Sequence, residues 1–420
     1  MRFKVFKNTV LLFVLVFISC GNKVKPEATS SKLEKSQAKD ILNQDQDYKS
    51  VVVGANKTEE YLPLLEGKSV GIVANQTSVI FKNNSAYTHV VDSLLNRNIH
   101  IKKVFAPEHG FRGTADAGEV IKDGIDTKTG LPIVSLYGNN KKPSVEQLKD
   151  LDIVVFDIQD VGARFYTYIS SLHYVMEACA EQNIPILILD RPNPNGHYID
   201  GPILEPEHKS FVGMHPVPVV HGMTIAEYAK MINGEGWLKN EVKCELKIIP
   251  VENYKHQTAY SLPIKPSPNL PNDTAINLYP SLCFFEATTV SVGRGTDKQF
   301  QIVGSPNIIL SKADFEFTPQ PNEGSKYPKH QGKVCYGYDL SKYKKAEGIN
   351  LKWLIEFYNF SKESENTKDN FFTDFFTTLA GTKKLQQQIE AGFSAKEITA
   401  SWKKGLKDFA TLRDNYLIYD

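Results

Sequence analysis

Leu151-Asp152-Ile153-Val154-Val155-Phe156 has the composition of a buried β-strand, because β-branched and aromatic residues dominate a short, almost uninterrupted apolar run. The amphipathic pattern from Phe165 to Gln182 predicts a helix, and Ile184 to Leu189 repeats the buried-strand composition. A strand, a crossover helix and a second strand form the unit that pairs two strands in parallel. This stretch therefore predicts an α/β fold built on a parallel sheet.

The same alternation extends to both sides of this unit. Further strands are expected at Ser69 to Ala74, Ile99 to Phe105 and Glu245 to Ile249, and further helices at Lys57 to Leu65, Ser85 to Asn96 and Thr224 to Asn233. A hairpin-like stretch is expected from Val120 to Tyr137. Short strands separated by helices are typical of a doubly wound sheet, which we expect over residues 51–302.

A different pattern begins near Val303. A smaller α+β domain is expected over residues 303–420. Its strands are expected near Ile308 and at Lys333 to Tyr338, and its helices near Leu351 to Ser361, Asn370 to Leu379, Thr382 to Ala391 and Ala395 to Asp408.

The first twenty residues have the features of a signal peptide. Basic residues precede an apolar run, Val10 to Ile18, that is too short to span a bilayer as a helix. The sequence Phe17-Ile18-Ser19-Cys20-Gly21 resembles a bacterial lipobox, which implies cleavage before Cys20 and attachment of lipid to its thiol. An ordinary secretory signal is the alternative. Residues 21–50 are polar and predict a disordered tether.

We therefore expect an exported lipoprotein that is anchored to a membrane. No acidic run follows Cys20, and this favours the periplasmic face. The spacing of the other four cysteines is wide and irregular and does not indicate a zinc site. A disulfide between two of them is an open alternative, and they are Cys179, Cys244, Cys283 and Cys335.

Charge and loop motifs exclude several function classes. The 49 basic and 48 acidic side chains give a formal net charge of +1, so no overall field attracts nucleic acid. The sequence lacks a Gly-x-Gly-x-x-Gly loop after the first strand. The run Gly67-Lys68-Ser69-Val70-Gly71 contains Gly-Lys-Ser and Gly-x-Ser-x-Gly, but it stands at the start of the first predicted strand, whereas a phosphate-binding loop and a nucleophile elbow both follow a strand. We therefore expect neither a nucleotide cofactor nor a serine nucleophile.

Polar clusters follow the predicted strands at the point where each strand ends. They are Asn75-Gln76-Thr77, Glu108-His109, Asp157-Ile158-Gln159-Asp160 and Asp190-Arg191-Pro192-Asn193. Ligands of doubly wound sheets bind outside the carboxyl ends of the strands. We therefore expect these clusters to converge on one crevice.

The loop Phe105 to Glu119 places an acid, an imidazole and a guanidinium between glycines. A glycosidase needs a carboxylic acid that protonates the leaving oxygen and a second group at the anomeric carbon. Glu108 fits the first role, because apolar neighbours such as Phe105 and Phe111 favour a protonated carboxyl group. The alternative is that Glu108 only pairs with Arg112. Asp157 and Asp160 are candidates for the second role or, alternatively, local caps.

Several other side chains are candidates for binding substrate. Arg164 and Arg294 each offer a guanidinium fork for a carboxylate, although pairing with Asp160 and Asp297 respectively is the alternative. The full set of expected binding residues is Asn75, His109, Arg112, Arg164, Tyr166, Asn193 and Arg294. His109 and His173 could ligate a metal, but no close His/Asp spacing supports one.

Long motifs in the same order resemble the NamZ-type exo-β-N-acetylmuramidases, formerly a conserved domain of unknown function. They are Pro107-Glu108-His109-Gly110-Phe111-Arg112-Gly113, Asp157 to Tyr168, Asp190 to Pro194, Pro266 to Leu270 and Val292 to Asp297. The resemblance implies a Rossmann-like N-terminal domain, a smaller C-terminal domain and an active cleft between them. It also implies release of terminal N-acetylmuramic acid from peptidoglycan fragments, with Glu108 at the family's proposed catalytic position.

The chemistry of muramyl saccharides agrees with these residues. The lactyl carboxylate of N-acetylmuramic acid would explain the arginines, and its acetamido group could itself attack the anomeric carbon, with Asp157 or Asp160 steadying the amide. Two alternatives remain. One is a non-catalytic lipoprotein that binds cell-wall sugars, and the other is a metal-dependent deacetylase or amidase that acts on peptidoglycan.

Overall fold

The computed structural model describes residues 50–82, 86–113, 123–308, 312–363 and 371–420. Residues 51–420 belong to one compact unit. The predicted signal peptide with Cys20, and the tether up to residue 49, lie outside the described residues, as do residues 120–122 of the expected hairpin. None of the helices in the described ranges has the length and apolar character needed to cross a membrane.

We call the described residues up to 272 the first part of the chain and those from 273 onward the second part. A seven-stranded sheet with the order β5-β6-β4-β1-β7-β8-β9 forms the centre of the first part. All neighbouring strands pair in parallel except β5 with β6. The strands are β1 (Val70–Ala74), β4 (Ile101–Ala106), β5 (Gly124–Ile125), β6 (Pro132–Ser135), β7 (Ile153–Asp157), β8 (Ile186–Leu189) and β9 (Leu246–Ile249). The six parallel strands follow the Rossmann order 3-2-1-4-5-6, with the change of direction between β1 and β7. The predicted α/β class and the Rossmann-like sheet are confirmed.

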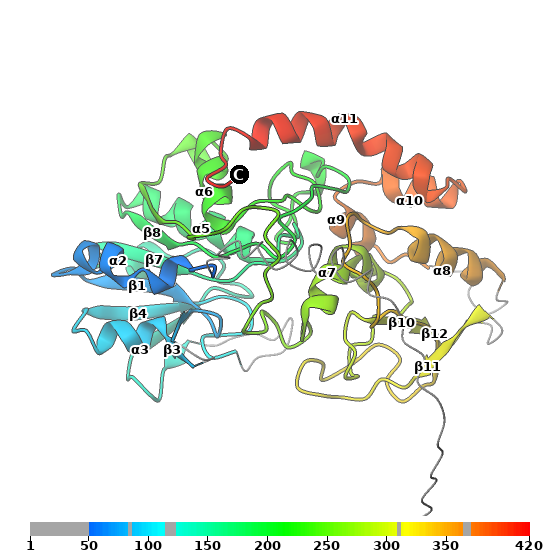
Figure 1. The fold of residues 1–420 in the computed structure, drawn as a ribbon, viewed down its shortest axis with the longest axis horizontal. Coiled ribbons are helices and arrows are strands. Elements are labelled where there is room, and N and C mark those ends of the chain that lie inside the picture. Colours follow the sequence, from blue (N-terminus) through cyan, green and yellow to red (C-terminus); the bar gives the residue numbers. More distant parts are fainter. Residues whose placement is uncertain (1–49, 83–85, 114–122, 309–311, 364–370) are drawn as a thin grey trace, which may run out of the picture. The chain divides into compact units, whose positions relative to one another are not determined.

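Alternation along each strand divides the apolar residues between two faces of this sheet. In β7, Val154 and Phe156 pack in one apolar cluster with α5 and α6, whereas Ile153 and Val155 pack in a second cluster with α2 and α3. The helices therefore cover both faces (Figure 1). They are α2 (Thr58–Leu65), α3 (Val90–Leu95), α4 (Val145–Leu148), α5 (Tyr168–Glu181) and α6 (Ile225–Gly234).

The sequence correctly predicts the capping box of α6 but not the start of α3. The capping box of α6 is present, because Thr224 accepts from the Glu227 amide while the Glu227 carboxylate accepts from the Thr224 amide. The helix expected from residue 85 begins only at Val90. The residues before it form the antiparallel pair β2 (Val79–Phe81) and β3 (Tyr87–His89).

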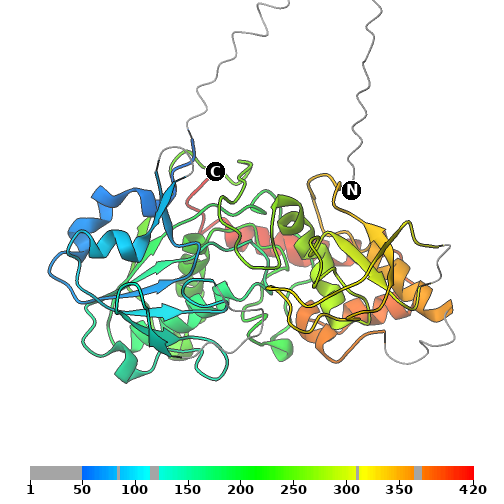
Figure 2. The ribbon, with the colours of Figure 1, turned by 90° about the horizontal axis from the view of Figure 1, so that it is seen from below.

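The second part of the chain has a three-stranded antiparallel sheet in the order β10-β12-β11. Its strands, drawn in yellow to orange, form a group separate from the blue to green strands of the large sheet (Figure 2). They are β10 (Ile302–Ser305), β11 (Phe315–Phe317) and β12 (Cys335–Asp339). The strand expected near Ile308 thus lies a few residues earlier, in β10.

Helices make up much of the remainder of the second part. They are α7 (Asp273–Leu282), α8 (Lys352–Glu363), α9 (Phe375–Ala380), α10 (Lys384–Glu390) and α11 (Ala395–Arg413). Among the described residues there are also four short 3-10 helices: Gly54–Asn56, Pro206–His208, Lys239–Glu241 and Cys283–Ala287. Helix α7 was not expected from the sequence, since Pro280 lies inside it and a proline-rich stretch precedes it.

Helix α11 leads the chain back to the large sheet, beside α6 (Figure 1). The backbone amides of Ile418 and Tyr419 donate to Glu227 Oε1 at 2.9 and 3.2 Å, and the Tyr419 hydroxyl donates to Asp190 Oδ2 at 2.7 Å. One apolar cluster also runs from Val73 of β1 to Phe409 of α11. The two parts therefore share a core, and the domain boundary expected at residues 302 and 303 stays a prediction.

The four cysteines outside the signal region are all buried and free: Cys179, Cys244, Cys283 and Cys335. The structure thus shows no disulfide among the described residues. Burial raises the pKa of each of these thiols, so they stay protonated.

Candidate active site

A pocket of about 520 Å³ lies between the end of the large sheet and the second part of the chain. Residues of the first part that line it include Glu108, His109, Tyr137, Tyr166 and Thr167. Residues of the second part include Tyr279, Glu286, Arg294, Tyr327 and Phe375. Segments far apart in the sequence thus build a single concave site, as expected for a small-molecule pocket.

Glu108 follows the carboxyl end of β4 and extends into this pocket. The Tyr137 hydroxyl donates to its Oε1 at 3.0 Å, and the Thr167 hydroxyl donates to its Oε2 at 2.8 Å. Burial and the nearby Glu108 carboxylate raise the pKa of Tyr137, so this hydroxyl remains a proton donor. The carboxyl group is therefore held in one orientation from both oxygens.

The turn after Glu108 depends on left-handed backbone conformations. His109 has a φ of 70° and Gly110 a φ of 78°, so the chain reverses sharply directly after the carboxylate. His109 also lines the pocket, although it is itself almost fully buried.

The apolar walls around Glu108 differ from those expected. Phe105 is buried in the sheet core, and Phe111 packs edge-on against His89, 4.9 Å between ring centroids. Neither residue lines the pocket. The aromatic walls are instead supplied by Phe165, Tyr166, Phe211, Tyr279 and Phe300.

Arg294 lines the same pocket on a turn between Gly293 and Gly295, which both have positive φ values. Its Nε and Nη2 donate to the two carboxylate oxygens of Glu286 at 2.6 and 2.8 Å. The guanidinium also lies 5.1 Å from the centroid of the Phe300 ring. The ion-pair partner is therefore Glu286 rather than Asp297, and this pair, which has no net charge, fixes the guanidinium at the pocket wall.

The two aspartates expected to assist Glu108 do not line the pocket. Asp157 is fully buried at the end of β7, where Arg191 binds both its oxygens at 2.6 and 3.0 Å. Asp160 accepts the Gly162 amide at 2.6 Å and lies 3.9 Å from His221 Nε2. Burial raises the pKa of Asp160 to about 7. Arg191 thus satisfies Asp157, whereas Asp160 Oδ1 is buried without a hydrogen-bond partner among the described residues.

The two asparagines expected to bind substrate also have internal partners. Asn75 donates to the Tyr168 hydroxyl at 2.8 Å, and its side-chain oxygen accepts from the amide and hydroxyl of Thr77. Asn193 donates to the Met223 carbonyl at 2.9 Å and accepts the Asn195 amide at 2.8 Å. Neither lines the pocket. These amides close the turns after β1 and β8.

Arg112 and Arg164 have structural partners as well, and neither lines the pocket with Glu108. Arg112 pairs with Asp92 at 3.1 Å and Asp126 at 2.8 Å, not with Glu108. Arg164 is fully buried. It donates to four backbone carbonyls, those of Pro202, Val217, Leu379 and Ala380, at 2.7 to 3.1 Å. Arg164 therefore joins the two parts of the chain instead of pairing with Asp160 or facing a ligand.

Of the expected site residues, Glu108, His109, Tyr166 and Arg294 meet in one pocket. The residues that sequence reasoning missed are Tyr137, Thr167 and Glu286. Thr167 stands inside the motif that begins at Asp157, and that position was a usable signal. Tyr137 and Glu286 lie outside the quoted motifs, and only the tertiary structure brings them to the site.

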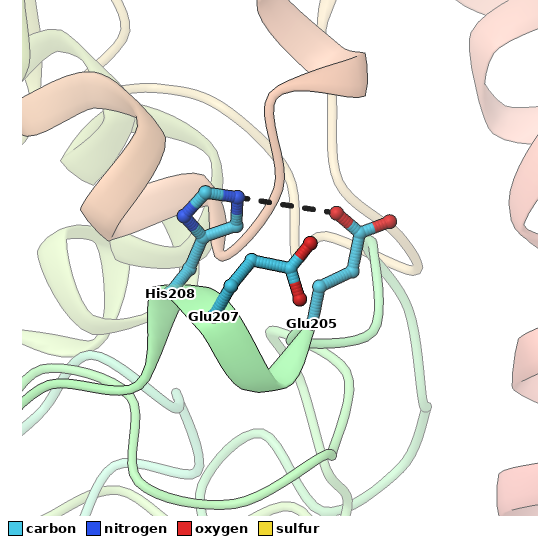
Figure 3. Close-up of side chains that lie close together, drawn as sticks. All are labelled: Glu205, Glu207 and His208. Carbon is cyan, nitrogen blue, oxygen red and sulfur yellow. Dashed lines mark ion pairs between the residues drawn. The ribbon is translucent and has the colours of Figure 1, made fainter.

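A possible metal-binding group lies elsewhere. Among the residues that the structure describes, Glu205, Glu207 and His208 bring potential ligand atoms together (Figure 3). Lys384 Nζ already donates to Glu205 Oε1 at 2.5 Å, and the Thr382 hydroxyl to Oε2 at 2.9 Å. The Glu205 carboxylate is thus already neutralised, and we assign no metal to this group.

His173, the other histidine considered as a ligand, belongs to a buried network. Its Nδ1 lies 2.9 Å from His215 Nε2, and its Nε2 lies 3.5 Å from Glu177. It does not line the pocket with Glu108.

Comparisons with known proteins cover nearly all of the described chain. The family model described as "Exo-beta-N-acetylmuramidase NamZ, N-terminal" matches residues 70–274, and the corresponding C-terminal model matches residues 277–419. The chain is 38% identical over 388 residues to the peptidoglycan beta-N-acetylmuramidase NamZ of Bacillus subtilis, which covers 86% of this chain and 89% of that protein.

Two crystal structures of DUF1343 family proteins from Bacteroides fragilis have the same fold. One has a TM-score of 0.80 at 47% identity, over 89% of this chain and 99% of that chain. The other has a TM-score of 0.75 at 27% identity, over 88% of this chain and 99% of that chain.

Proposed function

Because the chain belongs to the NamZ family of exo-beta-N-acetylmuramidases, we propose that it is a glycosidase that releases terminal β-linked N-acetylmuramic acid from peptidoglycan fragments. The observation that carries this proposal is the pocket in which Tyr137 and Thr167 hold the Glu108 carboxyl group. Cell-wall turnover or recycling is the process that such an activity serves.

Glu108 acts as the general acid in this proposal. It donates a proton to the glycosidic oxygen while the bond to the anomeric carbon breaks, so that the leaving sugar departs as a neutral alcohol. The hydroxyls of Tyr137 and Thr167 keep the carboxyl group oriented and stabilise the carboxylate formed by proton transfer.

Arg294 serves as a cation for the lactyl carboxylate of N-acetylmuramic acid. Its guanidinium is fixed by Glu286 and lines the pocket, so the N–H groups that Glu286 does not bind can donate hydrogen bonds to this carboxylate. Glu286 is a weak nucleophile, since both its oxygens already bind Arg294. The acetamido group of the substrate is therefore the favoured partner for the anomeric carbon: its oxygen bonds to that carbon as the glycosidic bond breaks, so no protein nucleophile is needed. Water then opens the resulting ring and gives a proton back to Glu108, which releases N-acetylmuramic acid.

The test is hydrolysis of a chromogenic β-N-acetylmuramic acid glycoside by the purified full-length protein. The β-N-acetylglucosamine analogue checks specificity. Glu108→Gln should lower the rate by about two to four decades, less if the leaving group needs little protonation. Glu146→Gln is the matched control, because this exposed carboxylate lies outside the pocket.

Three outcomes would contradict parts of this proposal. Binding of the sugar without hydrolysis by the wild type would favour a sugar-binding protein. Loss of activity with a chelator would favour metal-dependent chemistry. Full activity of Glu108→Gln would move the acid role to another residue.

We also propose that lipid on Cys20 anchors the protein to a membrane and that it faces the periplasm. The basic, apolar and lipobox-like segments at the start of the sequence support this proposal. Mass spectrometry of the mature protein should find the added lipid at Cys20, and Cys20→Ser should move the protein from the membrane fraction to the soluble fraction. An unmodified Cys20 in the mature protein would contradict the anchor.

A further inference from the structure

An aromatic strip begins at the residue that holds the catalytic carboxyl group. Tyr137, which donates to Glu108 Oε1 at 3.0 Å, has its ring centroid 6.4 Å from that of Phe211. Phe211 in turn lies nearly parallel to Tyr174, with 6.3 Å between centroids and 19° between the ring planes. All three side chains are half-buried, and Tyr137 and Phe211 line the pocket. We call Tyr137, Phe211 and Tyr174 the aromatic strip.

The direction of the strip follows from the chemistry of Glu108. A general acid must reach the glycosidic oxygen, which joins the cleaved sugar to the leaving group. The leaving group therefore lies on the Glu108 side of the cleaved sugar. The strip starts at this side, because its first member is in direct contact with Glu108.

The strip has the chemistry that binds a pyranose. The axial C–H bonds of a sugar form an apolar face that packs against aromatic rings, while its hydroxyls need polar groups at the edges. Lys141 Nζ lies over the face of the Phe211 ring, 4.6 Å from its centroid, so a sugar packed on that face would displace this flexible side chain and could then accept a hydrogen bond from its ammonium group. Of the other exposed aromatic residues, Tyr327 and Phe375 line the same pocket but have no ring contact with Tyr137, and Phe393 lies outside it.

We propose that Phe211, with Tyr137 and Tyr174 beside it, forms the subsite for the leaving-group sugar, which in a peptidoglycan fragment is N-acetylglucosamine. This inference rests on the proposed function. In this subsite Phe211 raises kcat/KM for substrates with a saccharide leaving group. It does not take part in binding the muramyl group that is released.

The experiment compares two substrates that share the muramyl group. One is the disaccharide of N-acetylmuramic acid β-linked to N-acetylglucosamine, and the other is N-acetylmuramyl β-fluoride, whose leaving group is too small to contact the strip. Phe211→Ala should lower kcat/KM for the disaccharide about tenfold and leave that for the fluoride within about twofold. Phe211→Tyr should restore use of the disaccharide, since it keeps the ring.

The controls separate this inference from folding and from the proposed function. Phe393→Ala removes a half-exposed ring outside the pocket and should change neither substrate. Phe211→Leu keeps apolar volume without an aromatic face and should behave like Phe211→Ala, with an unchanged melting temperature. Equal losses on both substrates, or no loss on the disaccharide, would overturn the subsite. Failure of the wild type to hydrolyse either substrate would instead overturn the proposed function.

Discussion

Replacing Arg164 with leucine tests whether this arginine holds the fold together or binds substrate. Its guanidinium donates four hydrogen bonds to backbone carbonyls, two at residues 202 and 217 and two at residues 379 and 380. Leucine would occupy part of the same buried space but would leave these four acceptors without their donor. The variant should therefore lose stability and should not primarily lose substrate affinity.

The magnitude follows from two opposing contributions. Hydrogen bonds from a charged donor contribute about 1.5–2 kcal/mol each, or about 6–8 kcal/mol for the four. Burial lowers the pKa of Arg164 to about 10, well below its ordinary value, so keeping it charged in the fold costs about 3 kcal/mol. The difference predicts a loss of about 3–5 kcal/mol in the free energy of unfolding, a large fraction of the stability of an ordinary domain.

Urea denaturation followed by circular dichroism measures this loss, with Arg164→Lys as the conservative variant that keeps a charged donor. We expect Arg164→Lys to lose less than Arg164→Leu. A loss below about 1 kcal/mol for Arg164→Leu would refute the reasoning, since it lies under the cost of a single buried unsatisfied group. An unchanged unfolding curve with a raised KM would support substrate binding instead.

Three further predictions concern other buried groups. Burial raises the pKa of Asp160 to about 7 from its ordinary value near 3.8, so its contribution to stability is complete below about pH 4 and is lost as the pH rises through 7. Urea denaturation should therefore show a lower free energy of unfolding at pH 8 than at pH 5, and Asp160→Asn should make this difference smaller. An unchanged difference in the variant would contradict the role of Asp160. Tyr419→Phe removes the donor to Asp190 Oδ2 and should cost about 2 kcal/mol of unfolding free energy, whereas a cost near zero would mean that water replaces the hydroxyl. Thr167→Val removes one of the hydroxyls that orient Glu108 and should lower kcat about tenfold with little change in melting temperature; a change in KM alone would not agree with an orienting role.

Local patterns made most of the fold predictable from the sequence. The apolar run that contains Val154 is a central strand, and the Thr224 and Glu227 pair begins a helix, because both signals act over a few neighbouring residues. The missed helix α7 contains Pro280, and the overlooked pair β2 and β3 depends on how two short segments meet. These features have no strong local signal.

The candidate site was less predictable, for a physical reason. Polar residues do follow the parallel strands, and Glu108 after β4 lines the pocket. At the end of β7, however, Asp157 is buried against Arg191, and after β1 the Asn75 amide binds Tyr168. Buried polar groups must find partners, and at crowded strand ends the nearest partners are often one another. The sequence shows which residues reach the sheet edge, but it does not show which of them remain available to a ligand.

The return of the chain beside α6 has a consequence for the order of folding. Tyr419 contacts Asp190 across a sequence separation of 229 residues, and Ile418 contacts Glu227 across 191. Contacts of such long range slow folding, because the entropy of closing the loop is lost before the contacts form. During synthesis all strands of the large sheet are made long before residues 418 and 419, so Asp190 and Glu227 lack these hydrogen-bond donors until the end of the described chain is made. The large sheet is thus synthesised first but gains its last hydrogen bonds only when residues 418 and 419 are made. We expect a ribosome-bound chain to reach native resistance to proteolysis only at that late stage, in a single step.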